Sequence, residues 1–399
     1  MENLNIKTFN LESLIEFRHW VHENAELSLV EFNTHKKIKE YGLNLGVPEA
    51  AWIECAKTGW KVDIKGRGPA FGKPRMIAVR SDHDALPIVE KNPHLPYASK
   101  SNVSHMCGHD GHTACLLGGM ALLMDNLEKI PSDRTVRFIF QPAEECLGGA
   151  HTMVKEGILD GVDEVYGCHN LPISEIPEQI LIADKEMLAD MQELEITIHG
   201  KGGHGSTPEK CNNPIPIACR AYMEIIQGLT EYQKQVDSRV RFSLTTFNAG
   251  NANNVIPYSV VISGTLRNFS TIEADNMEDI IRKVLDRVTS ETDSRYDMIF
   301  KRSTHGAVVN DPKYAQYIRK YAKDHYGENM VTNNLLPVYA SEDFAEYLQT
   351  RPGAFFLRVG RNLPPGSYVH TDTYDFDDGI IEDLSKFWFR IMYERLNSE

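Results

Sequence analysis

The stretch MIAVRSDHD, residues 76–84, passes from an apolar run directly into charged residues, and this pattern decides the fold class. The run TVRFIF at 135–140 and the run VDEVYGC at 162–168 end in the same way, at polar residues. Between the first two runs, Asp110–Leu127 is rich in Ala, Leu and Gly and has the length of a buried helix. Strands that alternate with helices favour a mostly parallel sheet with helices on both faces. Polar residues directly after such strands lie where α/β proteins place their active sites.

The chain has 399 residues, which is too long for one ordinary hydrophobic core and suits two domains. From about residue 189 the pattern changes to strand, helix, strand, strand, helix, strand, which is the ferredoxin-like order. The strands are predicted near 191–199, 241–247, 258–267 and 296–302, and the helices near 214–233 and 271–292. We therefore predict an α/β catalytic domain formed by residues 1–188 and 305–399. A small α+β ferredoxin-like domain, residues 189–304, is inserted between these two parts.

The composition excludes several classes of protein. With 42% hydrophobic and 25% charged residues, the chain is typical of a folded globular protein rather than a disordered one. The net charge of −14 and the lack of a basic stripe argue against nucleic acid as a partner. The longest apolar stretch, Ala114–Met124, is too short to cross a membrane, and the first residues lack the features of a secretory signal. Seven dispersed cysteines then favour reduced thiols in a cytoplasmic protein.

Potential metal ligands gather in the segment HMCGHDGH, residues 105–112. Cys107 and His109 are separated by one glycine, and both are good ligands for a borderline metal such as zinc. The segment QPAEE, residues 141–145, adds Glu144 and Glu145 directly after a predicted strand. Since side chains of adjacent residues diverge, one carboxylate can bind a metal while the other faces a water. Metal-assisted hydrolysis requires this division of roles.

Further candidate ligands lie at other predicted strand ends. His169 directly follows the run at 162–168, and His370 occupies a similar position near the other end of the chain. Asp82 and Asp84 flank His83, so either carboxylate could orient a ligating imidazole and fix its tautomer. These positions predict one metal centre assembled from segments that are distant in sequence.

Other functional classes remain as alternatives. A non-catalytic metal-binding or scaffold protein would keep the same fold, but it would not need Glu144 as a base. The segment GKGGHG, residues 200–205, satisfies the dinucleotide-binding pattern and would indicate an oxidoreductase. That pattern requires the third glycine to open a helix, and here three prolines follow within eleven residues of Gly205. No G-x-S-x-G motif is present, which disfavours a serine hydrolase.

Taken in series, the motifs resemble those of a known family. RSDHDALPI, HMCGHDGHTA, QPAEE followed by GGA, HNLP, GKGGHGSTP, NNVIP, GTLR, SEDF and VHTD occur in one order from about Arg18 to Phe387. They resemble the dinuclear metallopeptidases related to aminoacylase and carboxypeptidase G. The similarity is greatest to their amidohydrolase branch, which includes hippurate hydrolase, indoleacetyl-amino-acid hydrolases and N-acetyl-amino-acid deacetylases.

This resemblance implies roles for individual residues. The residues that match metal ligands of the family are Cys107, His109, Glu145, His169 and His370. Glu144 matches the general base, and Asp84 matches an aspartate that orients the ligands. In the inserted domain, His204 matches a histidine that stabilises the oxyanion. Asn254 and Arg267 match residues that hold the carboxylate of the substrate.

The resemblance also implies a reaction, a cofactor and an assembly. We expect two divalent metal ions per subunit (Zn, Mn, Co or Ni), and a metal-bridging water that Glu144 activates for hydrolysis of N-acyl amino acids. The inserted domain is expected to act as a lid and as a dimerisation domain, with His204 reaching the active site of the partner subunit. A metallo-carboxypeptidase or dipeptidase of the same fold is the alternative. His83, Glu209 and Asn251 depart from the family pattern, which leaves the substrate preference open.

Overall fold

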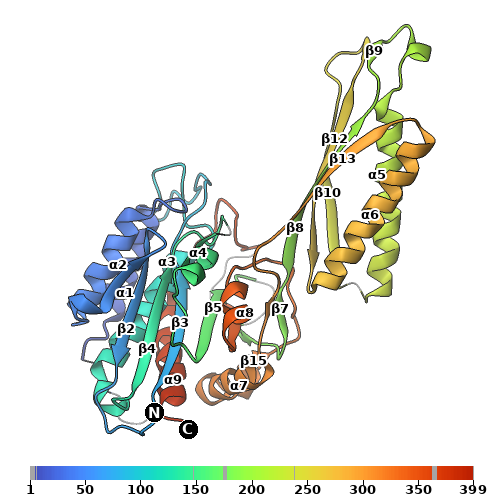
Figure 1. Cartoon of the computed structure of the whole chain (residues 1–399). Helices are drawn as coiled ribbons and strands as arrows, with labels where there is room; N and C mark the ends of the chain where they lie inside the picture. The colour runs from blue at the N-terminus through green and yellow to red at the C-terminus, as the bar shows by residue number, and fades with distance from the viewer. Residues whose placement is uncertain are drawn as a thin grey trace. The chain divides into compact units, whose positions relative to one another are not determined.

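A computed structural model describes residues 5, 7–146, 148–173, 178–237, 239–361 and 366–398 (Figure 1). The chain divides into two compact units. The large unit contains residues 1–187, 309–337 and 343–399, and the small unit contains residues 188–308 and 338–342. The segment 338–342 joins the small unit through hydrogen bonds from the Ala189 N–H to Val338 O (3.1 Å) and Ala340 O (2.9 Å). No local sequence pattern predicted that the chain returns to the small unit at residues 338–342.

The large unit is built on one mixed sheet with the strand order β1-β2-β4-β3-β5-β16-β6-β15. Its central strands β4, β3, β5 and β16 run parallel, β1 and β2 pair antiparallel with their neighbours, and β6 pairs antiparallel with β16 but parallel with β15. The strands are Trp52–Cys55 (β1), Gly59–Lys65 (β2), Arg75–Asp82 (β3), Arg134–Gln141 (β4), Glu164–Asn170 (β5), Ile180–Leu181 (β6), Val331–Thr332 (β15) and Gly353–Arg358 (β16). The predicted α/β class, with a mostly parallel mixed sheet, is confirmed.

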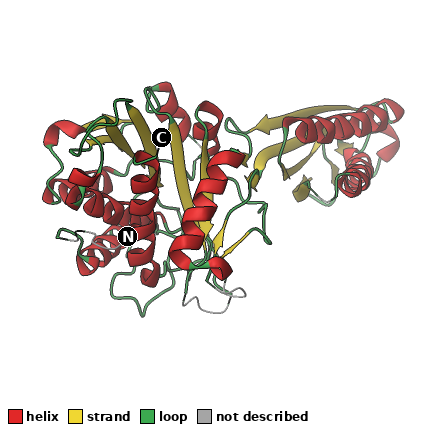
Figure 2. Cartoon of the chain, turned by 90° about the horizontal axis from the view of Figure 1, so that it is seen from below, coloured by secondary structure: helices red, strands yellow, loops and turns green. Residues whose placement is uncertain are grey.

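Helices cover both faces of this sheet (Figures 1 and 2). They are Leu11–Glu23 (α1), Phe32–Asn44 (α2), His109–Asp125 (α3), Gly149–Lys155 (α4), Pro312–Tyr326 (α7), Ala345–Thr350 (α8) and Ile381–Leu396 (α9). Helix α3 is buried from His109 to Leu123 because it lies between the sheet and other helices. A Cβ atom on Gly118 would lie 2.1 Å from the Ser385 Oγ of α9, so glycine is needed for this close approach.

The small unit has a four-stranded antiparallel sheet with the order β10-β12-β8-β13. Its main elements are β8 (Asp190–His199), α5 (Pro214–Gln235), β10 (Arg241–Ala249), β12 (Ser259–Asn268), α6 (Thr271–Glu291) and β13 (Arg295–Arg302). Alternate residues of β8 and β12 are buried against α5 and α6, as in a half-exposed sheet. The predicted ferredoxin-like arrangement is confirmed.

The remaining elements are short. They are the strands β7 (Glu186–Leu188), β9 (Gly203–His204), β11 (Val255–Ile256) and β14 (Val308–Val309), and five 3₁₀ turns at Glu49–Ala51, Leu127–Lys129, Pro208–Lys210, Glu328–Met330 and Asp378–Ile380. Strand β9 pairs with β11, so the glycine-rich segment 200–205 lies in a small ribbon and does not open a helix. Across the described residues, no helix combines the length and the apolar character that a membrane span requires.

Candidate metal and catalytic centre

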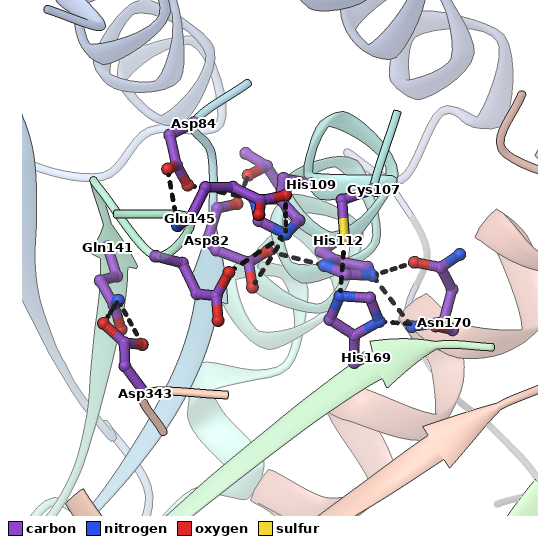
Figure 3. Close-up of polar contacts among 12 residues, drawn as sticks. Asp82, Asp84, Cys107, His109, His112, Gln141, Glu145, His169, Asn170 and Asp343 are labelled. Atoms are coloured by element: carbon purple, nitrogen blue, oxygen red, sulfur yellow. Dashed lines mark hydrogen bonds and ion pairs between the residues drawn. The ribbon is translucent and has the colours of Figure 1, made fainter. Parts of the chain in front are cut away.

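The carboxyl ends of β3, β4 and β5 lie side by side, and the amino end of α3 meets them there (Figures 1 and 3). Strand β3 ends at Asp82, β4 ends at Gln141, and β5 ends just after His169. Helix α3 begins at His109, after Gly108 with a left-handed φ of 92°. A Cβ atom on Gly108 would lie 2.6 Å from the Asn170 Oδ1, so a side chain there would disturb the end of β5.

The five predicted metal ligands form two overlapping groups. The donor atoms of Cys107, His109 and His169 lie within 4.8 Å of one another, and so do those of Cys107, Glu145 and His370. Cys107 Sγ is 3.4 Å from His169 Nε2, and His370 Nε2 is 3.4 Å from Glu145 Oε1. Because Cys107 belongs to both groups, its sulfur lies where it could contact two neighbouring ions.

Two buried polar atoms of these groups lack a hydrogen-bond partner among the described residues. They are His109 Nε2 and Glu145 Oε1, which lie 3.9 Å apart. Buried polar atoms without partners are rare because desolvation is costly, and an ion bound between them would satisfy both. Thiolate, imidazole and carboxylate ligands together suit a borderline divalent metal. The residues present therefore fit the expected metal site.

Asp84 holds two of these ligands from behind. Its Oδ1 is 3.1 Å from His109 Nδ1, and its Oδ2 accepts hydrogen bonds from the Glu145 N–H (3.0 Å) and the Ser28 hydroxyl (2.7 Å). Burial by itself would raise the pKa of Asp84, but the hydrogen bond and charge of His109, together with the hydrogen bonds from Ser28 and the Glu145 N–H, outweigh it, and the pKa is lowered. An ionised Asp84 keeps the proton of His109 on Nδ1, which leaves Nε2 free to bind a metal.

Two of the predicted ligands, Cys107 and His109, hold their protons more tightly than usual when no metal is bound. Burial raises the pKa of the Cys107 thiol well above its usual value, and the nearby Glu145 and Glu144 carboxylates act in the same direction. Burial alone would lower the pKa of His109, but Asp82 and Asp84 outweigh it and raise the pKa to about 10. A metal ion must therefore displace protons as it binds.

His112 is a site residue that the sequence analysis quoted but did not assign. Its Nδ1 is 2.6 Å from Asp82 Oδ1, its Nε2 accepts a hydrogen bond from the Asn170 N–H (2.9 Å), and its ring centre lies 4.5 Å from that of His169 (Figure 3). It supports the end of β5 that carries His169. The spacing of His109 and His112 at the start of a helix places both on one face and could have identified it.

His83 points away from this centre. Its side chain is fully buried, Nε2 lies 3.0 Å from Thr58 O, and burial lowers the pKa of His83 to about 3. It belongs to none of the potential metal-binding groups among the described residues. Its role is to pack beneath the site as a neutral imidazole.

Glu144 and Glu145 follow Ala143, which has a left-handed φ of 56°. The Glu144 Oε2 is 3.9 Å from His109 Nε2, and its side chain is buried. Both carboxylates therefore face His109, and they diverge less than the sequence analysis expected. This proximity places Glu144 beside any ion that His109 and Glu145 bind.

The predicted substrate residues lie in the small unit. His204 is exposed on β9, and Asn254 lies beside it, because Asn254 O accepts a hydrogen bond from the Gly205 N–H (2.8 Å). The Ser206 N–H donates to His204 Nδ1 (3.1 Å), so a neutral His204 carries its proton on Nε2 and can donate it to a substrate.

Arg267 lies near the other end of β12. Its side chain is half-buried, and the described part of the chain offers its guanidinium no hydrogen bond or ion pair. Burial lowers the pKa of Arg267, with Asp190 opposing the shift. A half-buried cation without a close partner is suited to binding an anion. Strand β9 pairs with β11 just before the Ser259 end of β12, whereas Arg267 lies eight positions beyond Ser259, a span of about 26 Å at the usual rise per residue.

Comparisons with known proteins identify the family of the chain. Residues 78–394 match the model of peptidase family M20/M25/M40. The chain is 33% identical over 377 residues to thermostable carboxypeptidase 1 of Saccharolobus solfataricus, covering 92% of each chain. It is 31% identical to hippurate hydrolase of Campylobacter jejuni, covering 99% of this chain and 100% of that protein.

The fold is similar to that of solved structures. The YxeP protein of Bacillus subtilis, a dinuclear metal-binding peptidase from the M20 family, superposes with a TM-score of 0.79 and 28% identity. The match covers 98% of this chain and 99% of that one. The resemblance found in the motifs is thereby confirmed: the chain belongs to peptidase family M20/M25/M40 and is a hydrolase of amide bonds.

Proposed function

We propose that this protein hydrolyses the amide bond of N-acyl amino acids with the help of two divalent metal ions. The observation that carries the proposal is the convergence of Cys107, His109, Glu145, His169 and His370 at the carboxyl edge of the sheet, where two buried ligand atoms have no hydrogen-bond partner among the described residues. The metal-binding relative of known structure supports the same number of ions. Zn, Mn, Co and Ni all accept this set of ligands.

The bound ions would polarise the substrate carbonyl and lower the pKa of an attacking water. The remaining chemistry belongs to this chain. Glu144 is positioned to accept the proton of the attacking water on its carboxylate and to return it to the departing amine. Asp84 keeps His109 and Glu145 oriented during this exchange.

The small unit would bind the substrate. Arg267 would hold the free α-carboxylate, because a planar guanidinium binds a carboxylate with two parallel hydrogen bonds. His204 would donate from Nε2 to the carbonyl oxygen as negative charge develops there, and Asn254 would add a neutral donor.

The separation of these residues supports a dimer. His204 lies on β9, which pairs with β11 just before the Ser259 end of β12, and Arg267 lies near the other end of β12. The stretch from Ser259 to Arg267 alone spans about 26 Å, which is longer than an N-acyl amino acid. A single substrate can contact both His204 and Arg267 only if one of these residues comes from a second copy of the chain. The proposed enzyme is therefore a homodimer, at least, in which His204 acts in the site of the partner subunit. We also place it in the cytoplasm, which agrees with seven free cysteines.

A carboxypeptidase is the second candidate, because one similar relative has that activity in its name. A panel of substrates separates the two. We expect turnover of N-acetyl, N-benzoyl or indoleacetyl amino acids, and much slower release of the C-terminal residue from tri- and tetrapeptides. Efficient cleavage of the peptides with no turnover of the acyl amino acids would refute the proposed substrate class.

A further inference from the structure

The SEDF motif, Ser341–Phe344, belongs to the family pattern but has no role in the reaction described above. Its Asp343 is buried in the large unit with 1% of its surface exposed. The Asp343 carboxylate accepts hydrogen bonds from the Gln141 side-chain amide (2.8 and 2.9 Å) and from the Ala150 N–H (3.0 Å) (Figure 3).

These two partners mark the two ends of the segment that carries Glu144 and Glu145. Gln141 is the last residue of β4, and Ala150 lies in the first turn of α4, where backbone N–H groups lack helical partners. The ends are pressed together, since a Cβ atom on Gly149 would lie 1.7 Å from Pro142 O. Asp343 thus bridges the two ends of this loop, because it accepts hydrogen bonds from Gln141 at one end and from Ala150 at the other. We call these two ends the neck of the loop.

A buried arginine extends the same network to β3. Arg80 is fully buried, and it donates to Asp343 Oδ1 (3.1 Å), Gln141 Oε1 (2.9 Å) and Asp82 Oδ2 (2.6 Å). Asp82 in turn holds His112. One carboxylate therefore fixes the ends of β3, β4 and α4 relative to one another, directly behind the predicted base and ligands.

We propose that Asp343 is a positioning residue, which holds Glu144 and Glu145 in their working positions by closing the neck of their loop. This inference rests on the proposed function of Glu144 as the base and Glu145 as a metal ligand. A displacement of about 1 Å in a reacting group costs on the order of 100-fold in rate. Asp343 contacts neither the substrate nor the metal in this scheme, so its effect passes through the loop.

The test compares two buried carboxylates. In Asp343→Asn, an NH2 group replaces one carboxylate oxygen, so one end of the loop loses its hydrogen-bond acceptor. The matched control is Glu164→Gln, because Glu164 is equally buried and pairs with Arg75 (2.9 Å) and Arg395 (2.9 Å), but at the opposite end of β5. Both variants should lower Tm. Only Asp343→Asn should lower kcat at saturating metal, by about 10- to 100-fold, with KM within about 3-fold of wild type.

A milder variant keeps the test decisive if Asp343→Asn does not fold. Gln141→Met opens the neck but keeps the contacts of Arg80 with Asp82 and Asp343. It should lower kcat in the same direction. The variant that carries both substitutions should be no slower than Asp343→Asn, because both substitutions weaken the same connection between Gln141 and Asp343.

Three outcomes would overturn the proposal: an unchanged kcat in Asp343→Asn, an equal loss of kcat in Glu164→Gln, or a loss that appears only as a shifted pH–rate profile. The last would indicate a direct effect of charge on Glu144, whose carboxylate lies within 4.8 Å of Asp343. Metal affinity gives a readout that does not depend on the substrate. Asp343→Asn should weaken Mn²⁺ binding more than Glu164→Gln does, even if the wild type hydrolyses no acyl amino acid and the proposed function fails.

Discussion

Glu144 and Glu145 are adjacent in sequence, but they have different roles in the proposed reaction. Glu144→Gln should retain its metal and lose about 100- to 10,000-fold in turnover, because an amide cannot accept the proton of the attacking water. Glu145→Gln should instead weaken metal binding, because it replaces a charged ligand. Elemental analysis of each variant, set beside its kcat, measures both effects. Equal loss of metal in the two variants would contradict this division of roles.

Arg267 is the residue to which the account assigns the substrate carboxylate. Arg267→Ala should raise KM for N-acyl amino acids by roughly 10- to 100-fold, since a charge-assisted pair is lost. Steady-state kinetics with matched substrates whose carboxylate is amidated provide the control, and their KM should hardly change. A similar rise in KM for both kinds of substrate would show that Arg267 acts through the fold instead.

At the scale of elements, His22 on α1 ties this helix to the start of α3. Its Nδ1 is 2.9 Å from Asp110 Oδ2, and its Nε2 is 3.3 Å from Glu90 Oε1. Burial alone would lower the pKa of His22, but the hydrogen bonds to Asp110 and Glu90 outweigh it and raise the pKa to about 9. The folded state therefore binds this proton more tightly than the unfolded state, where the pKa is about 6.5.

This shift predicts a pH-dependent stability. The contribution, on the order of 3 kcal/mol, is fully present below about pH 6.5 and is lost as the pH rises through about 9. His22→Gln has no group at this position that titrates in this range. The free energy of unfolding of the variant should therefore fall less than that of the wild type between about pH 6.5 and about pH 9. Urea unfolding at about pH 6 and about pH 9 measures it, with His199→Gln as a control because its partner Asp297 is exposed. An unchanged pH dependence in His22→Gln would refute the link.

The sequence predicted those helices and strands that leave a local pattern of apolar and polar residues. The runs that end at Asp82, Gln141 and His169 predict strands because the sequence changes there from apolar to polar residues. The contact of Gln141 with Asp343 could not be predicted, since 202 residues separate them and no periodic pattern records which distant residue a buried amide meets.

At the scale of the whole molecule, the account predicts shared active sites. Inactive Glu144→Gln and His204→Ala subunits, mixed and reassociated, should regain part of the activity, because one hybrid site combines both wild-type groups. The sequence suggested this only through the family resemblance. The proposal also has a physical reason, because β9 pairs with the segment just before Ser259 and Arg267 lies near the other end of β12. Hybrid dimers that form but show no recovered activity would contradict it.

The dependence of hydrolysis on bound metal is the decisive measurement for the proposed reaction. The protein is stripped with a chelator, and Mn²⁺ or Zn²⁺ is titrated back while hydrolysis of an N-acyl amino acid is followed. The account predicts that the stripped protein is inactive and that activity returns and saturates near two ions per chain. Full turnover by a protein shown to be free of metal would contradict the account.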